Sequence, residues 1–167
     1  PDMAVGRLVE TPAEIVAQVD WFLADGEIAA SEAIVTGYSS LADSAQETCS
    51  ALVADGLFPD CSLIGNSWTA TQFVNYVLNR RHDLVSFSGH ANHYTISTPS
   101  GAVSSAQVQG GTGDHSGTLF WPPGCHGARN VPPETAISLD TVQALVNRRA
   151  LVVGNTGYGW SYTFNVG

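Results

Sequence analysis

The sequence contains no lysine and only six arginines, against 15 acidic residues, which gives a formal net charge of -9 over 167 residues. A chain this acidic repels the phosphates of nucleic acids and the headgroups of anionic membranes, whose binding depends on cationic side chains. The sequence also lacks any hydrophobic run of the roughly 18 to 20 residues that a membrane-spanning helix needs. We therefore expect neither a nucleic-acid partner nor a membrane span.

Cysteine is scarce as well, with three residues at Cys49, Cys61 and Cys125. Three thiols allow one disulfide and one free thiol, and Cys49 with Cys61 is the natural pair if the protein is exported. If that pair forms, Cys125 is the cysteine left over. The alternative is that Cys49 and Cys61 are ordinary buried thiols.

Length and composition predict one domain over residues 1–167. With 44% hydrophobic and 13% charged residues, the chain can bury one sizeable core and needs no second domain. Residues 1–5 lack the basic start and cleavage site of a signal peptide and have the pattern of a buried strand. Residues 162–167 follow soon after another predicted strand. Both ends therefore look cut from a longer chain, in which other domains would be possible.

Short apolar runs alternate with segments of helical periodicity along the chain. The predicted strands cover residues 33–37, 62–65, 84–88, 119–121 and 151–153, and the predicted helices cover 12–25, 41–55, 70–79 and 139–149. The first of these helices has an apolar stripe, which consists of Ile15, Val16, Val19, Phe22 and Leu23. Short continuous apolar strands between helices are typical of a parallel sheet with helices on both faces. The predicted fold class is therefore α/β, a three-layer sandwich with a mostly parallel sheet flanked by helices. The stretch between His90 and Leu119 is expected to hold a hairpin over 93–98 and a mobile glycine-rich loop over 110–113.

Two of the predicted strands end in residues that can do chemistry together. Residues 84–88 lead into Gly89-His90, and residues 119–121 lead through two prolines into Gly124-Cys125. In parallel sheets ligands gather at the carboxyl ends of strands, so two such strands deliver their end residues to one edge. A neighbouring imidazole lets a thiol act as a nucleophile, and N–H groups in a tight Gly-Cys turn can stabilise an oxyanion. The pattern indicates a cysteine hydrolase.

Other interpretations of the same residues stay open. Cys125 can be a small buried residue at the end of a core strand, although the polar turn residues around it favour a position near solvent. His90 can be a capping histidine satisfied by backbone groups. A zinc hydrolase is a further alternative, because His90 and His93 are three residues apart and could bind zinc with Cys125, His126 or His115. Against zinc, no Cys-x-x-Cys pair is present and the histidines follow a strand rather than one helix face.

The same motifs resemble those of the caspase-like cysteine peptidases, in which an apolar strand ends in His-Gly and a later one in Gly-Cys or Ala-Cys. Within that group the chain is most similar to the gingipain family, and the resemblance covers nearly the whole chain. Residues 1–7 resemble a strand of the form Pro-Asp-apolar-Gly-Arg, and residues 35–38 resemble a following strand end. Residues 124–127 and 153–160 complete the series in the same order. The resemblance implies a caspase-like fold and a secreted or cell-surface protein.

The resemblance also implies roles for individual residues. Cys125 would be the nucleophile and His90 the general acid, with the N–H groups of Cys125 and Ala91 forming the oxyanion hole. Where the family has a glycine after the histidine, this chain has Ala91, which keeps its N–H but restricts the backbone. His93 is an alternative acid. His126 would support the reacting residues without reacting itself.

The implied reaction is hydrolysis of a peptide or protein substrate through a thioester, with no cofactor and no metal. Asp114, Tyr158 and Trp160 are candidates for the substrate pocket, although Asp114 can equally be a solvated loop aspartate. The rival function is a catalytically inactive caspase-like scaffold or binding domain of a larger secreted protein. The ends that look cut and Ala91 both favour this alternative, and the intact Cys125 and His90 disfavour it.

Overall fold

A five-stranded parallel sheet organises the part of the chain that the computed structural model describes, which comprises residues 11–25, 30–122, 124–131 and 139–158. A second, three-stranded antiparallel sheet lies beside it. In chain order the elements are α1 (Pro12–Asp25), β1 (Ala33–Gly37), the 3-10 turn η1 (Ser39–Leu41), α2 (Ala42–Ala54), β2 (Asp60–Ile64), α3 (Ala70–Phe73), the π-helical turn η2 (Val74–Leu78), β3 (Leu84–Ser88), β4 (Ala91–Asn92), β5 (Thr95–Ser97), β6 (Ala102–Ser104), α4 (Ser105–Gln109), β7 (Leu119–Trp121), α5 (Thr141–Val146) and β8 (Leu151–Val152).

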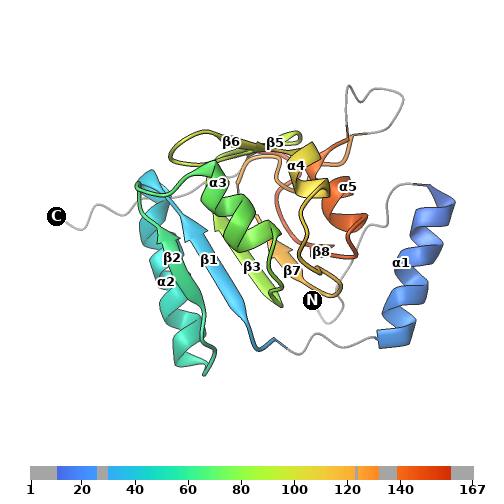
Figure 1. The fold of residues 1–167 in the computed structure, drawn as a ribbon, viewed down its shortest axis with the longest axis horizontal. Coiled ribbons are helices and arrows are strands. Elements are labelled where there is room, and N and C mark those ends of the chain that lie inside the picture. The colour runs from blue at the N-terminus through green and yellow to red at the C-terminus, as the bar shows by residue number, and fades with distance from the viewer. Residues whose placement is uncertain (1–10, 26–29, 123, 132–138, 159–167) are drawn as a thin grey trace.

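The strands of the larger sheet all run parallel in the order β2-β1-β3-β7-β8 (Figure 1). β1 pairs with β3 over its whole length, and β3 pairs with β7, where Val85 lies opposite Phe120. The strand order turns back between β1 and β3, because β2 lies on one side of β1 while the later strands are added beyond β3. In open parallel sheets, ligands bind outside the carboxyl ends of the strands next to such a reversal. Because all five strands run parallel, the predicted parallel sheet is confirmed.

Helices cover both faces of this sheet. Successive side chains of a strand point to opposite faces, and β1 shows this with two neighbouring residues. Ile34 belongs to the larger core cluster, together with Phe73 of α3 and Leu145 of α5. Val35 belongs to a smaller cluster with Ala45 of α2. The arrangement is compatible with the predicted three-layer sandwich.

Side-chain caps determine where several helices begin. The Thr69 hydroxyl accepts the Gln72 N–H at 3.2 Å, and the Gln72 side chain accepts the Thr69 N–H at 2.9 Å. Asp140 in the same way accepts the Gln143 N–H at 2.7 Å. Such reciprocal or single caps satisfy N–H groups that the helix leaves unpaired. The predicted helix over 139–149 therefore begins only at residue 141, and it ends at residue 146, before Arg149 with its positive φ of 61°.

The stretch between β3 and β7 is more ordered than the sequence predicted. A hairpin is present, but its strands β4 and β5 cover 91–92 and 95–97, so it begins before the predicted range of 93–98. β6 and α4, which the sequence did not predict, follow it. The expected mobile glycine loop is a closely packed connection. A Cβ at Gly111 would lie 2.4 Å from Arg148 Nη1, and one at Gly113 would lie 2.4 Å from the Arg80 carbonyl oxygen. Close backbone packing is the reason for these glycines.

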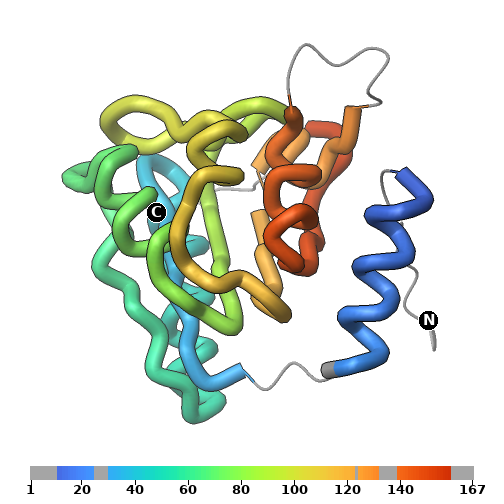
Figure 2. Tube along the Cα trace, turned by 45° about the vertical axis from the view of Figure 1, so that its right-hand side comes forward, coloured from blue at the N-terminus to red at the C-terminus, as the bar shows by residue number. Residues whose placement is uncertain are grey.

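Helix α1 contacts the rest of the protein through the side that the sequence did not indicate. The Glu14 carboxylate accepts a hydrogen bond from Gln143 at 3.2 Å, and the Trp21 ring lies over Gly117. Val16, Phe22 and Leu23 of the predicted apolar stripe remain 58%, 50% and 75% exposed. Figure 2 shows α1 beside the other elements rather than between them. Within the described ranges, no helix is long and apolar enough to cross a membrane.

Candidate active site

The residue that joins β3 to His90 occupies a space in which only glycine fits. A Cβ on Gly89 would lie 2.5 Å from the Phe87 ring and 2.8 Å from the Tyr38 ring, so the residue between β3 and His90 must lack a side chain. His90 itself is exposed. Its N–H donates to the Tyr38 hydroxyl at 3.3 Å, and its carbonyl oxygen accepts from the Ser97 N–H at 2.9 Å. The backbone of His90 is thus held from both sides while its imidazole faces solvent.

Cys125 lies in a tight turn just beyond β7. The Gly127 N–H closes this turn on the Gly124 carbonyl oxygen at 3.3 Å, and the Cys125 thiol is half-buried and outside any disulfide. His126 has a positive φ of 53°, a strained conformation for a residue with a side chain. Strained backbone of this kind persists only where the surroundings impose it.

The loop after β8 supplies those surroundings. The His126 N–H donates to the Gly157 carbonyl oxygen at 2.7 Å, and the Ala128 N–H donates to the Asn155 carbonyl oxygen at 3.0 Å. The His126 ring nitrogen Nδ1 lies 3.1 Å from the Thr156 carbonyl oxygen. Three contacts therefore tie the turn of Cys125 to residues 155–157.

The two strand ends meet directly in front of their reactive residues. A Cβ on Gly124 would lie 2.2 Å from the Gly89 carbonyl oxygen and 3.5 Å from the Ala91 Cβ. The residue before Cys125 and the residue before His90 are therefore in backbone contact, which only a glycine at position 124 allows. The structure brings the Cys125 and His90 segments together at the carboxyl edge of β3 and β7, where the sequence placed them.

Ala91 fits this site although the resembling family has glycine there. The described non-glycine residues with positive φ do not include Ala91, so the alanine needs no left-handed backbone. In the β4–β5 pairing, Ala91 lies opposite Ile96, and the Ser97 N–H bonds the preceding carbonyl oxygen of His90. Because hydrogen-bonded pairs alternate along an antiparallel ladder, the Ala91 N–H points away from β5.

Two more of the expected site residues, His93 and Tyr158, lie at the same edge, on either side of His126. The ring centroids of His93 and His126 are 6.5 Å apart, and the His126 ring meets the Tyr158 ring at 4.9 Å. The Nδ1 atom of His93 is buried and has no hydrogen-bond partner among the described residues. Trp160, the remaining pocket candidate, lies outside the described residues.

Asp114 is not brought to this site. It precedes β7 and lies at the opposite, amino-terminal edge of the sheet, where its carboxylate is 3.7 Å from Arg81 Nη1 and accepts the Ser116 N–H at 3.0 Å. The hydrogen bond from Ser116 lowers the pKa of Asp114. This carboxylate therefore does not line a pocket at Cys125, and of the two interpretations that the sequence left open for Asp114, the loop aspartate is the one that its position fits.

Cys49 of α2 and Cys61 of β2 form a disulfide, with their Cα atoms 6.4 Å apart. Of the two states that the sequence left open, the disulfide is thus the one present. It joins a helix to an edge strand of the sheet, and Cys125 is the cysteine outside the disulfide. His115, considered as a zinc ligand, is 1% exposed and packs against Phe120 in the core. In the described ranges no three His, Cys, Asp or Glu side chains lie close enough to hold a metal ion.

One side chain at the site was missed from the sequence. Tyr38 follows β1 directly, is 8% exposed, and contacts both Gly89 and His90. Its signal in the sequence is its place, since a polar aromatic residue directly after a buried strand lies at the same carboxyl edge as His90. That signal becomes useful only once β1 and β3 are known to be neighbours.

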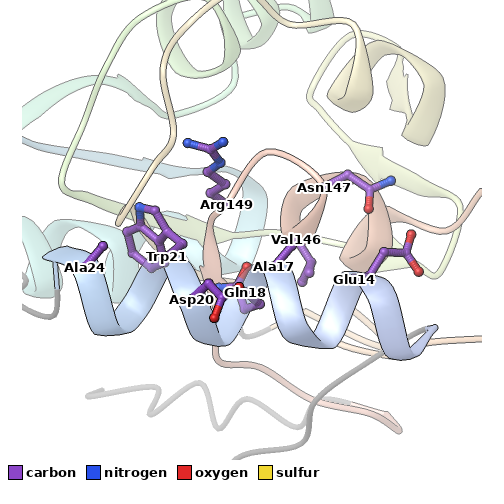
Figure 3. Close-up of a pocket in the computed structure, with 9 residues that line it drawn as sticks. All are labelled: Glu14, Ala17, Gln18, Asp20, Trp21, Ala24, Val146, Asn147 and Arg149. Atoms are coloured by element: carbon purple, nitrogen blue, oxygen red, sulfur yellow. The ribbon is translucent and has the colours of Figure 1, made fainter.

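The groove drawn in Figure 3 lies away from these residues. It runs between α1 and the end of α5 and contains neither cysteine nor histidine; Glu14, Ala17, Gln18, Asp20, Trp21, Ala24, Val146, Asn147 and Arg149 line it. Comparisons of the chain with models of known protein families, with curated proteins and with solved structures found no match. The case for a function therefore depends on the geometry around Cys125 and on the sequence motifs.

Proposed function

We propose that this protein is a cysteine endopeptidase of the caspase-like, gingipain type, with Cys125 as nucleophile and His90 as general acid. The observation that carries the proposal is the backbone contact between Gly124 and Gly89, because it brings together the two segments that carry Cys125 and His90. The motif resemblance supports it, as does the reversal of the strand order next to β3, because ligands bind outside the carboxyl ends of strands at such a reversal. The substrate would be a peptide or protein bound across this edge.

In the proposed mechanism the thiolate of Cys125 attacks the carbonyl carbon of the scissile peptide bond. The carbonyl electrons move to its oxygen, and the N–H groups of Cys125 and Ala91 stabilise the resulting oxyanion. Protonated His90 gives its proton to the leaving amine nitrogen as the C–N bond breaks, which leaves a thioester. Neutral His90 then takes a proton from water, the hydroxide attacks the thioester, and breakage of the C–S bond restores the thiolate.

The turn of Cys125 fits this role. Its contacts with residues 155–157 fix the backbone of the nucleophile before substrate binds, so that no reorganisation is needed when the oxyanion forms. The exposed position of His90 gives the imidazole access to a leaving group that departs towards solvent. Tyr158, 76% exposed and in ring contact with His126, would line the substrate side of the edge.

The test is hydrolysis of a fluorogenic peptide library, varied at the residue before the cut, in the presence of a reducing thiol mild enough to keep the disulfide. The parent is compared with Cys125→Ala, His90→Ala and His93→Gln. We expect cleavage that both of the first two substitutions reduce by at least about 100-fold, the lower range for removing a general acid, and that His93→Gln largely preserves. Loss on His93→Gln with activity retained in His90→Ala would move the acid to His93. No cleavage by a folded parent would favour the inactive scaffold.

A further inference from the structure

Tyr38 contacts the His90 segment through both its hydroxyl and its ring. Its hydroxyl accepts the His90 N–H at 3.3 Å, and its ring meets the His90 ring edge to face at 6.1 Å between centroids. The same ring fills the space that a side chain on Gly89 would need. One side chain thus touches both Gly89 and His90.

The backbone around Tyr38 is held rigidly in turn. Ser39 has a positive φ of 55°, and its N–H donates to Asn66 Oδ1 at 2.8 Å. The Gly37 carbonyl oxygen accepts from the Gly65 N–H at 2.9 Å and from the Trp68 indole N–H at 3.4 Å. The loops after β1 and β2 are therefore fastened together. A left-handed conformation at a serine is maintained only where such contacts over-determine it, and such residues concentrate at functional sites.

The buried Trp68 ring keeps the Tyr38 ring in one orientation. The ring meets the Trp68 ring at 5.8 Å with their planes at 81°, and Trp68 stacks on Phe73 in the core. Tyr38 is 8% exposed and Trp68 is 2% exposed. A rigid aromatic support therefore holds the hydroxyl at the His90 N–H, and the exposed His90 imidazole meets the same support at the Tyr38 ring.

We propose that Tyr38 is a positioning residue for His90, and that its hydroxyl fixes the histidine backbone so that the imidazole stays within reach of the Cys125 thiol. This inference rests on the proposed function, in which His90 acts on Cys125. Without the hydroxyl, the exposed imidazole samples orientations that do not serve the thiol. Catalysis by positioned groups is sensitive to displacements of this kind.

The variant that isolates the hydroxyl is Tyr38→Phe, because it retains the ring packing against Trp68. The readout is the pH dependence of alkylation of Cys125 by iodoacetamide, measured on the full chain with its disulfide intact. Thiolate reacts and thiol does not, so a neighbouring imidazolium raises the rate at and below neutral pH. The matched control is Tyr76→Phe, which deletes a phenol hydroxyl from the η2 turn, where the ring lies under Arg80 instead.

We expect Tyr38→Phe to slow alkylation at pH 6 to 7 by about 3- to 10-fold, the range that corresponds to one hydrogen bond. The profile should shift towards that of His90→Ala, and Tyr38→Phe should have no further effect in the His90→Ala background. Tyr76→Phe should follow the parent. In peptide hydrolysis, Tyr38→Phe should lower kcat and leave KM unchanged.

Three results would overturn the inference. An unchanged alkylation profile in Tyr38→Phe, with His90→Ala still effective, refutes the role of Tyr38 and leaves the proposed function intact. An equal slowing with and without His90 shows a general structural effect. A His90→Ala variant that alkylates like the parent refutes the proposed function together with this inference. If Tyr38→Phe does not fold, hydrogen exchange of the His90 amide in the parent replaces it. The inference expects a protected amide, because the Tyr38 hydroxyl accepts its N–H, and exchange as fast as in an unstructured peptide would contradict it.

Discussion

Substituting Gly124 by alanine should separate the two strand ends that carry His90 and Cys125. The added Cβ would lie 2.2 Å from the Gly89 carbonyl oxygen. Non-bonded atoms pack at about 3.5 Å or more, so the two backbones must part by about 1.3 Å. No positive φ is involved at Gly124, so the cost comes from this contact alone.

The expected loss of stability is that of overpacking in a well-packed region, about 2 kcal/mol within a typical range of about 1 to 3 kcal/mol. For a chain of this size that loss corresponds to a fall in Tm of about 4 to 8 °C. The effect on chemistry should be larger than the effect on stability. A displacement of about 1 Å at a reacting pair can reduce the rate by about 100-fold.

The assay combines thermal unfolding with the rate of Cys125 alkylation at pH 6.5. The matched control is Gly157→Ala, in the loop that supports the same turn, where a Cβ would meet nothing within 4 Å. That control should change stability by no more than about 1 kcal/mol, and in the stabilising direction. A Gly124→Ala variant with the Tm and alkylation rate of Gly157→Ala would refute the contact on which the site is built.

Three further predictions concern the rest of the fold. Burial and the charge of Arg148 lower the pKa of His115 to about 4, so the folded state holds its neutral form, and stability is complete above the unfolded pKa of about 6.5. The parent should therefore lose up to about 3 kcal/mol between pH 6.5 and pH 4, and His115→Leu should flatten this dependence in urea titrations; equal slopes would contradict it. Burial raises the pKa of Asp83, but hydrogen bonds from the Glu32 and Ser31 N–H groups outweigh it and lower the pKa to about 2. Asp83→Asn should thus cost about 1.5 to 3 kcal/mol at pH 7, with a difference from the parent that narrows below pH 3.8, and a pH-independent difference would be inconsistent with this. Replacing Cys49 and Cys61 together by alanine should lower the free energy of unfolding by about 3 kcal/mol, measured in urea, and a loss below about 1 kcal/mol would oppose a role for the disulfide.

The central part of the site could be predicted from the sequence because two strong local signals coincide. β3 and β7 have the predicted bounds, 84–88 and 119–121, and each is followed by a glycine and a reactive residue. The carboxyl ends of parallel strands share one edge, so His90 and Cys125 needed only that their strands be close. The structure makes the two strands direct neighbours.

What the sequence missed depends on contacts between distant segments. Tyr38 reaches His90 only because β1 lies next to β3, and strand order is not written in any local pattern. Asp114 was considered for a pocket at the carboxyl edge of the sheet. It lies at the amino-terminal edge, because the segment that leads into β7 reaches the sheet from that side. For α1, the sequence predicted that the apolar stripe packs against the rest of the protein. In the structure, Glu14 contacts Gln143 and Trp21 contacts Gly117 instead.

The most direct measurement of the central claim is detection of the covalent intermediate. The protein is mixed with an activated p-nitrophenyl ester of an N-acylated amino acid, quenched in acid and analysed by mass spectrometry after digestion. The account predicts one acyl group per chain, attached to Cys125 as a thioester, absent in Cys125→Ala and, at pH 6, formed more slowly in His90→Ala, where no imidazolium favours the thiolate. Acylation that His90→Ala leaves unchanged, or a folded parent that forms no adduct at Cys125, would contradict the proposed Cys125–His90 pair.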